Sequence, residues 1–209
     1  MVRNGIRAGS IILAFTLLGG CASMKLENYE FSGKESTYST DFSSADDTIE
    51  LLSPTARVDD GVLHMKPVGS GEAVRINMIY GMSSMTRFHL KVTETGPELF
   101  FNMLERYTGG HTRLATILRQ ENTHIFAWDK GNQVYDSFSE SGYLRPGTWH
   151  EIVIILHDGE YRLFVDGVLR KSLTVPPELP TEGYASFEYH YEAWVDDLEI
   201  YRFDSYLVE

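Results

Sequence analysis

Residues 146–169 read PGTWHEIVIILHDGEYRLFVDGVL, and this stretch decides the fold class. Apolar residues fill both parities from Ile152 to Leu156, which predicts a strand that is buried on both faces. Asp158-Gly159 and Asp166-Gly167 each follow a strand-like run, and Asp-Gly favours tight hairpin turns because positive φ costs glycine little. The stretch therefore predicts two successive β-hairpins.

The same period-two pattern recurs outward from this stretch. Apolar residues alternate along 74–80 and 88–92, and Asp60-Gly61 predicts a third hairpin. Residues 99–107 fit both a helical and a strand spacing, and we assign them to a strand. Many short strands separated by turns indicate an all-β fold, a two-sheet antiparallel β-sandwich or a barrel.

Composition sets limits on the function. The chain has 209 residues, 43% of them apolar and 12% aromatic, which suits one globular domain with a well-filled core. Its formal net charge is −12, and no cluster of Lys and Arg is present to neutralise a phosphate backbone. We therefore expect no nucleic-acid partner.

The N-terminus has the pattern of an export signal. Arg3 and Arg7 precede an apolar run over 11–18, which is too short to span a bilayer. Leu18-Gly19-Gly20-Cys21-Ala22 resembles the bacterial lipobox, and this resemblance implies cleavage before Cys21 and acylation of its thiol, as by palmitate. Cys21 is the one cysteine in the sequence, so no intramolecular disulfide is expected.

These features define the expected domains. We predict a lipoprotein signal peptide at 1–20, a lipidated Cys21 with a flexible Ser/Thr-rich tether over 21–37, and a β-sandwich over 38–209. Membrane contact would come through the anchor alone. Because Ala22 rather than Asp follows the cysteine, the expected location is the cell envelope, at the outer membrane if the source has two membranes.

Three segments carry a family resemblance. Residues 146–154 and 161–169, with the ending Ala193-Trp194-Val195-Asp196-Asp197-Leu198-Glu199-Ile200-Tyr201, are similar to laminin-G-like and other concanavalin A-like lectin/glucanase domains. The resemblance implies a jelly roll of two antiparallel sheets. It implies no particular activity, since this fold serves many functions.

One constellation could support acid–base catalysis. On a strand, Glu188, His190 and Glu192 would share one face, and the pattern resembles the Glu-x-Asp-x-Glu strand of jelly-roll glucanases, which supplies nucleophile, assisting acid and acid/base. However, His190 replaces the Asp of that pattern. A solvent-exposed polar strand face, with two tyrosines packed on the opposite face, is the commoner interpretation of such a sequence. We therefore favour a non-catalytic protein and keep these three residues as the catalytic alternative.

Metal sites have little support in the sequence. The histidines are scattered without a zinc-binding spacing, so we predict no metal ligands and no cofactor. Asp196-Asp197 could offer oxygens to Ca²⁺, but adjacent residues on a strand point to opposite faces, which makes turn or bulge hydrogen bonding the preferred reading.

Two aromatic–polar groups are candidates for ligand binding. Sugars stack their C–H faces on aromatic rings while their hydroxyls bond to polar side chains, so a glycan site should mix both types. The first group lies mid-chain and contains Tyr107, Trp128, Asp129, Asn132, Gln133 and Tyr135; the second, near the C-terminus, contains Tyr189, Tyr191 and Trp194. Core packing is the competing explanation for each aromatic residue.

The sequence leaves three functional hypotheses. The first is a lipid-anchored, non-catalytic domain that binds a polysaccharide or other glycan. The second is a divergent glycoside hydrolase or polysaccharide lyase. The third is a structural envelope protein that binds a protein partner.

Overall fold

The computed structural model describes residues 24–43, 47–66, 72–93, 98–107, 109–139 and 143–208. The predicted signal peptide and Cys21 lie outside the described residues. Within them, no helix is both long and apolar enough to cross a membrane.

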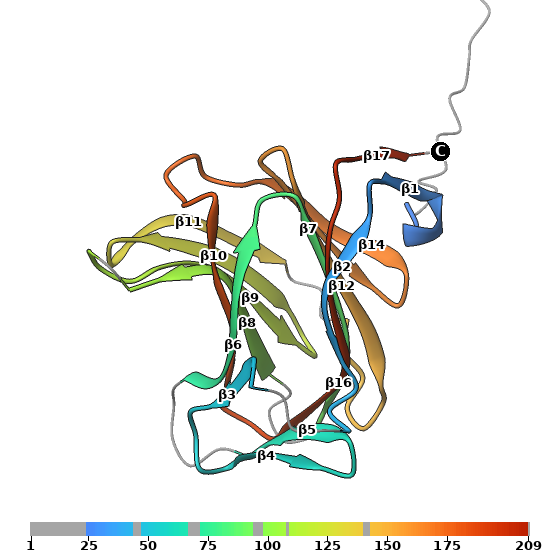
Figure 1. The fold of residues 1–209 in the computed structure, drawn as a ribbon, viewed down its shortest axis with the longest axis vertical. Coiled ribbons are helices and arrows are strands. Elements are labelled where there is room, and N and C mark those ends of the chain that lie inside the picture. Colours follow the sequence, from blue (N-terminus) through green and yellow to red (C-terminus); the bar gives the residue numbers. More distant parts are fainter. Residues whose placement is uncertain are drawn as a thin grey trace, which may run out of the picture.

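Two antiparallel sheets face each other, which confirms the predicted β-sandwich (Figure 1). The seven-stranded sheet has, in spatial order, β11 (Asn132–Ser139), β10 (Thr123–Asp129), β9 (Thr112–Arg119), β8 (Glu98–Arg106), β15 (Glu182–Tyr189), β6 (Glu72–Gly81) and β3 (Ile49–Leu51).

The eight-stranded sheet contains the strands formed by residues 150–169. Its order is β14 (Val168–Thr174), β13 (Glu160–Val165), β12 (His150–His157), β7 (Ser84–Val92), β16 (Ala193–Arg202), β5 (Val62–Met65) and β4 (Ala56–Asp59), with β2 (Glu35–Thr40) also paired to β16.

The predicted Asp-Gly turns are confirmed. Asp60-Gly61, Asp158-Gly159 and Asp166-Gly167 join β4 to β5, β12 to β13 and β13 to β14, and all six residues have positive φ between 48° and 78°. Positive φ at both central residues matches the right-handed twist of the strands, which is why these hairpins close tightly.

The main core lies between the sheets. Phe88 of the eight-stranded sheet contacts Phe101 and Phe187 of the seven-stranded sheet, with ring centroids 5.4 Å apart in both pairs. All three rings are fully buried. Inward-facing residues of both sheets complete this core, as the alternating pattern predicted.

A second apolar core covers the outer face of the eight-stranded sheet. Val153 and Ile155 of β12 face it, while Ile152, Ile154 and Leu156 face the main core, so β12 is buried on both sides as predicted. The cover comes from the 3₁₀ turn η1 (Leu26–Asn28) and from β1 (Tyr29–Ser32), which pairs with β17 (Ser205–Val208) (Figure 1).

This cover corrects the predicted tether. Residues 24–37 form η1, β1 and the first half of β2 rather than a flexible segment, so the folded domain begins before residue 38. The Ser/Thr-rich composition was misleading because β2 is held by backbone pairing to β16, which lies about 160 residues later in the chain. Its side chains therefore need not be apolar.

Trp149 immediately precedes β12. Its side chain is 40% exposed and is not part of the core. The ammonium of Lys91 lies 5.0 Å from its ring centroid, at the outer face of the eight-stranded sheet.

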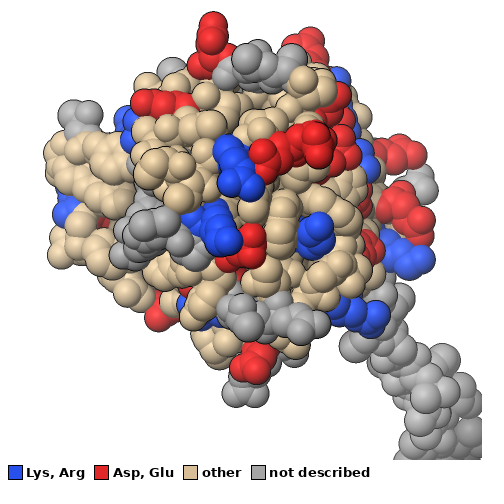
Figure 2. All heavy atoms as spheres, turned by 90° about the horizontal axis from the view of Figure 1, so that it is seen from below, with Lys and Arg blue, Asp and Glu red and all other residues tan. Residues whose placement is uncertain are grey.

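Acidic and basic side chains are mixed over the end of the molecule seen in Figure 2, with no continuous basic patch on that face.

Candidate functional site

The candidate site is the outer face of the seven-stranded sheet. Phe101 and Met103 of β8 and Phe187 of β15 point into the main core, so the residues between them point outward. Asn102 and Ser186, which are paired across the two strands, occupy the centre of this outer face.

A buried carboxylate anchors a polar network there. Glu105 is fully buried, and its Oε1 accepts hydrogen bonds from the Tyr107 hydroxyl and from His111 Nε2, both at 2.8 Å. Its Oε2 accepts one from the Ser186 hydroxyl at 2.6 Å. Three donors offset the cost of burying this carboxylate.

The network continues to a second carboxylate. Asn102 Nδ2 donates to Ser186 Oγ at 3.1 Å, and Arg113 Nη1 donates to Asn102 Oδ1 at 3.3 Å and to Glu188. The Arg113 and Glu188 side chains are only 15% and 14% exposed. Arg113 Nε is buried and has no hydrogen-bond partner among the described residues, so this guanidinium keeps an unused donor.

An aromatic and apolar strip borders the network. Phe100, Ala115, Ile117 and Phe126 form a separate cluster on the outer face, and Trp128 packs against it. The Arg113 guanidinium lies 5.4 Å from the Phe126 ring centroid and joins the strip to the network. The face thus combines a strip of nearly buried apolar side chains and the half-buried Trp128 with charged and polar groups.

A β-bulge places Glu105 in this face. Leu104 has φ of +55°, and the pairing of β8 with β9 shifts register between Met103 and Arg106. The extra residue lets Met103 and Leu104 both enter the core. Glu105, which would otherwise share the inward parity of Met103, therefore points outward. Gly183 allows the close backbone approach, because a Cβ there would lie 2.3 Å from the carbonyl carbon of Leu104.

The structure brings together only part of the first aromatic group. Tyr107 and Trp128 belong to the outer face described above. Asp129 accepts a hydrogen bond from the Thr112 hydroxyl at 3.2 Å. Asn132 and Gln133 are exposed on β11, and Tyr135 packs against the main core instead of joining a ligand surface.

The second aromatic group is dispersed. Tyr189 is buried in the main core, with its hydroxyl 2.7 Å from Thr55 Oγ1, and Tyr191 is exposed in the loop after β15. Trp194 lies on the eight-stranded sheet, stacked on His64 with centroids 5.0 Å apart, while Lys91 Nζ lies 4.5 Å from its ring centroid. Its ring is thus engaged by two neighbours.

The catalytic alternative does not form one strand face. β15 ends at Tyr189, and the chain then crosses to β16 of the other sheet. Glu188 stays with Arg113, His190 stacks on Phe100 with centroids 5.0 Å apart, and Glu192 Oε1 lies 2.8 Å from His64 Nε2. His190 thus stays with Glu188 at the outer face, where Phe100 lies, and Glu192 alone leaves this face, because the strand ends at Tyr189 and the chain crosses to the other sheet.

Asp196-Asp197 forms a bulge, in agreement with the prediction of turn or bulge hydrogen bonding. Asp197 has φ of +49°, its N–H donates to Asp196 Oδ1 at 2.8 Å, and its Oδ2 lies 3.1 Å from His89 Nδ1. The described residues contain no group of three His, Cys, Asp or Glu side chains that could hold a metal ion.

Comparison with known proteins fixes the family. A model of the concanavalin A-like lectin/glucanases superfamily matches residues 69–202. The chain belongs to this superfamily. No curated protein matches the sequence.

Solved structures agree with this superfamily fold. A Bacillus licheniformis β-glucanase matches with TM-score 0.59 at 8% identity, covering 81% of this chain and 98% of that one. A Bacillus subtilis protein of unknown function with a galectin-like fold matches with TM-score 0.66 at 12% identity, covering 83% and 98%. An endo-β-1,3-glucanase from Pyrococcus furiosus matches with TM-score 0.59 at 9% identity, covering 85% and 99%. At such identities these matches show a shared fold and nothing about activity.

Proposed function

We propose that this protein is a lipid-anchored component of the cell envelope whose sandwich binds a carbohydrate without cleaving it. The proposed binding surface is the outer face of the seven-stranded sheet. The observation that carries the proposal is the juxtaposition of the strip containing Phe100, Phe126 and Trp128 with the network of Arg113 and Glu188.

The chemistry of this surface suits a sugar. The C–H faces of a sugar ring can stack on the half-buried indole of Trp128, while hydroxyl groups bond to the carboxylate of Glu188 and the guanidinium of Arg113. Because the network fixes both charged side chains before the ligand arrives, little side-chain entropy is lost on binding. Superfamily membership is consistent with a glycan ligand.

The geometry favours binding over catalysis. Glu105 is inaccessible to solvent and engaged by three donors, and Glu188 is ion-paired with Arg113. A general acid or nucleophile must come within hydrogen-bond reach of the reacting atoms. In this arrangement Glu105 has no access to a substrate.

Hydrolysis is the second candidate, and one observation favours it. Two carboxylates, Glu105 and Glu188, lie on the same sheet face and are joined through Ser186, Asn102 and Arg113. Glycoside hydrolases use a pair of carboxyl groups across the scissile bond. This candidate replaces Glu192 by Glu105 as the partner of Glu188.

Replacing Trp128 tests the binding surface. Trp128→Ala should weaken retention of the protein by its polysaccharide about five- to tenfold, because the stacking ring is lost. Affinity electrophoresis in polysaccharide-containing gels measures this. Trp149→Ala is the matched control, since Trp149 is an exposed indole on the other sheet. Equal retention of the wild type and Trp128→Ala would remove this surface from the account.

Replacing Cys21 tests the anchor. Cys21→Ser removes the thiol that would carry the acyl chains, so the protein should move from the membrane fraction to the soluble fraction or remain unprocessed. Fractionation and the mass of the mature N-terminus check this outcome. Unchanged membrane association of a processed Cys21→Ser protein would refute lipid anchoring.

A further inference from the structure

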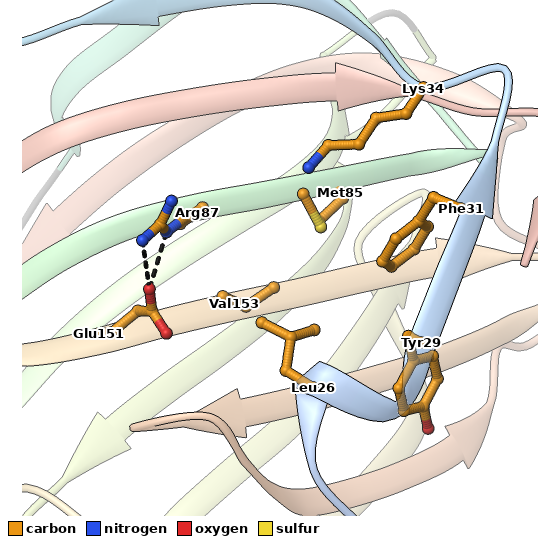
Figure 3. Close-up of a pocket in the computed structure, with 8 residues that line it drawn as sticks. All are labelled: Leu26, Tyr29, Phe31, Lys34, Met85, Arg87, Glu151 and Val153. Atoms are coloured by element: carbon orange, nitrogen blue, oxygen red, sulfur yellow. Dashed lines mark hydrogen bonds and ion pairs between the residues drawn. The ribbon is translucent and has the colours of Figure 1, made fainter. Parts of the chain in front are cut away.

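A pocket lies where the N-terminal segment crosses the outer face of the eight-stranded sheet (Figure 3). Leu26 of η1 and Tyr29 and Phe31 of β1 form one wall, and Met85 of β7 and Val153 of β12 form the floor. The pocket is on the opposite sheet from the proposed carbohydrate surface.

The size and lining of the pocket suit an alkyl chain. The pocket volume is about 330 Å³, which lies at the lower end of the range of volumes found for small-molecule binding pockets. Five of the eight lining residues are apolar or aromatic. Met85 and Val153 at the base are buried, so the half-buried Leu26 and Phe31 give the accessible apolar surface.

The two cations of the charged rim, Arg87 and Lys34, differ in their ion pairing with the described residues. Arg87 is engaged by the chain itself: its Nε and Nη2 lie 2.8 and 2.6 Å from Glu151 Oε1, and its Nη1 lies 3.4 Å from Glu199. Lys34 makes no ion pair with the described carboxylates. Its ammonium lies 4.0 Å from the Tyr201 ring centroid and extends over the pocket beside Met85 (Figure 3).

Lys34 lies in a partly desolvated setting of mixed charge. Burial lowers the pKa of Lys34, while the negative charge of Glu199 opposes this effect and the charge of Arg87 adds to it. An ammonium that has lost part of its hydration gains from a carboxylate within hydrogen-bond distance. The aromatic rings of Tyr201 and Phe31 hold it by cation–π contact without neutralising it.

We infer that this pocket binds a medium-chain carboxylate, with its alkyl chain along Leu26 and Phe31 and its carboxylate on Lys34. The apolar wall selects the chain, and the ammonium selects the anionic head. The inference does not depend on the carbohydrate site, because the two surfaces lie on different sheets.

Three probes separate the contributions of chain and head. A protein starting at Ala22 contains every described strand, from β1 to β17, and is titrated calorimetrically with decanoate, decanol and acetate. We expect decanoate to bind at least about tenfold more tightly than decanol, because only decanoate pairs with Lys34. Acetate should not bind measurably. Equal affinity for decanoate and decanol, or no binding of decanoate, would overturn the inference.

Variants locate the binding site. Lys34 is exposed enough to replace without disturbing the core, and Lys34→Met should lower decanoate affinity about tenfold while leaving decanol unchanged. Lys34→Arg should keep most of the affinity. Leu26→Trp should fill the pocket and weaken both ligands.

Controls test the separation of the two sites. Lys66→Met, an exposed cation outside the pocket, and Trp128→Ala should leave decanoate binding unchanged. Decanoate affinity that survives both Lys34→Met and Leu26→Trp would show that the fatty acid binds elsewhere and would overturn the assignment.

Discussion

At the residue scale, the candidate site depends on the contact between Leu104 and Gly183. The bulge at Leu104 turns Glu105 outward after two successive inward residues. The neighbouring strand can follow this bulge only because residue 183 has no side chain, since a Cβ would lie 2.3 Å from the Leu104 carbonyl carbon and 2.6 Å from Glu105 N.

Gly183→Ala should therefore lower the free energy of unfolding by at least about 2 kcal/mol, because the added methyl group overlaps backbone atoms that cannot rotate away. Urea unfolding followed by circular dichroism measures the change. Gly81→Ala is the matched control in the paired strand, where the nearest atom to an added Cβ is 3.9 Å away. If the two variants lose the same stability, the close approach at Gly183 has no energetic importance.

The residues of the site were only partly predictable. Tyr107 and Trp128 were identified from their composition as a possible sugar platform, and both lie on the outer face. Glu105, Asn102 and Arg113 were missed. A bulge adds one residue to a strand, so the side chains after it point to the opposite face from the one that alternation predicts. This break in alternation is why residues 99–107 also matched a helical spacing.

At the element scale, the N-terminal segment is part of the sandwich. Tyr29 is 6% exposed and meets the Phe164 ring edge-on, with centroids 5.2 Å apart. The segment thereby covers a sheet face that would otherwise expose Val153, Ile155 and Phe164. Burial of that face should contribute to stability in proportion to its apolar area.

Tyr29→Ala should lower the free energy of unfolding by about 3 kcal/mol, because a large buried aromatic ring is removed from the second core. Thermal and urea unfolding check this value. Tyr191→Ala removes a tyrosine that is 41% exposed and should change stability by less than about 0.5 kcal/mol. A negligible effect of Tyr29→Ala would restore the view of this segment as a loose tether.

Strands and hairpins could be predicted from the sequence where a turn motif or an alternating apolar pattern lies within a few residues of them. Asp-Gly turns and alternating apolar residues predicted the hairpins on either side of β13. Lys130-Gly131 makes the same kind of turn between β10 and β11, with φ of 50° and 84°, but its lysine gives no turn signal. Pairing of β1 with β17 joins opposite ends of the chain, and no local pattern reports such contacts.

At the scale of the whole molecule, the two sheets present different surfaces. The seven-stranded sheet carries a largely buried aromatic strip, with the half-buried Trp128 packed against it, beside a fixed polar network. The N-terminal segment covers part of the eight-stranded sheet and leaves the lined pocket. The formal net charge of −12 disfavours contact with anionic surfaces. A neutral glycan on the seven-stranded sheet is consistent with this balance.

The most direct test of the account mixes the protein from Ala22 to Glu209 with a panel of insoluble and immobilised polysaccharides. Each sample is assayed for loss of protein from solution and for newly released reducing or unsaturated ends. We expect that at least one polysaccharide depletes the protein from solution and that no ends are released. Release that disappears in Glu188→Gln would contradict non-catalytic binding and establish the hydrolase or lyase alternative, and an absence of depletion across the panel would contradict carbohydrate binding.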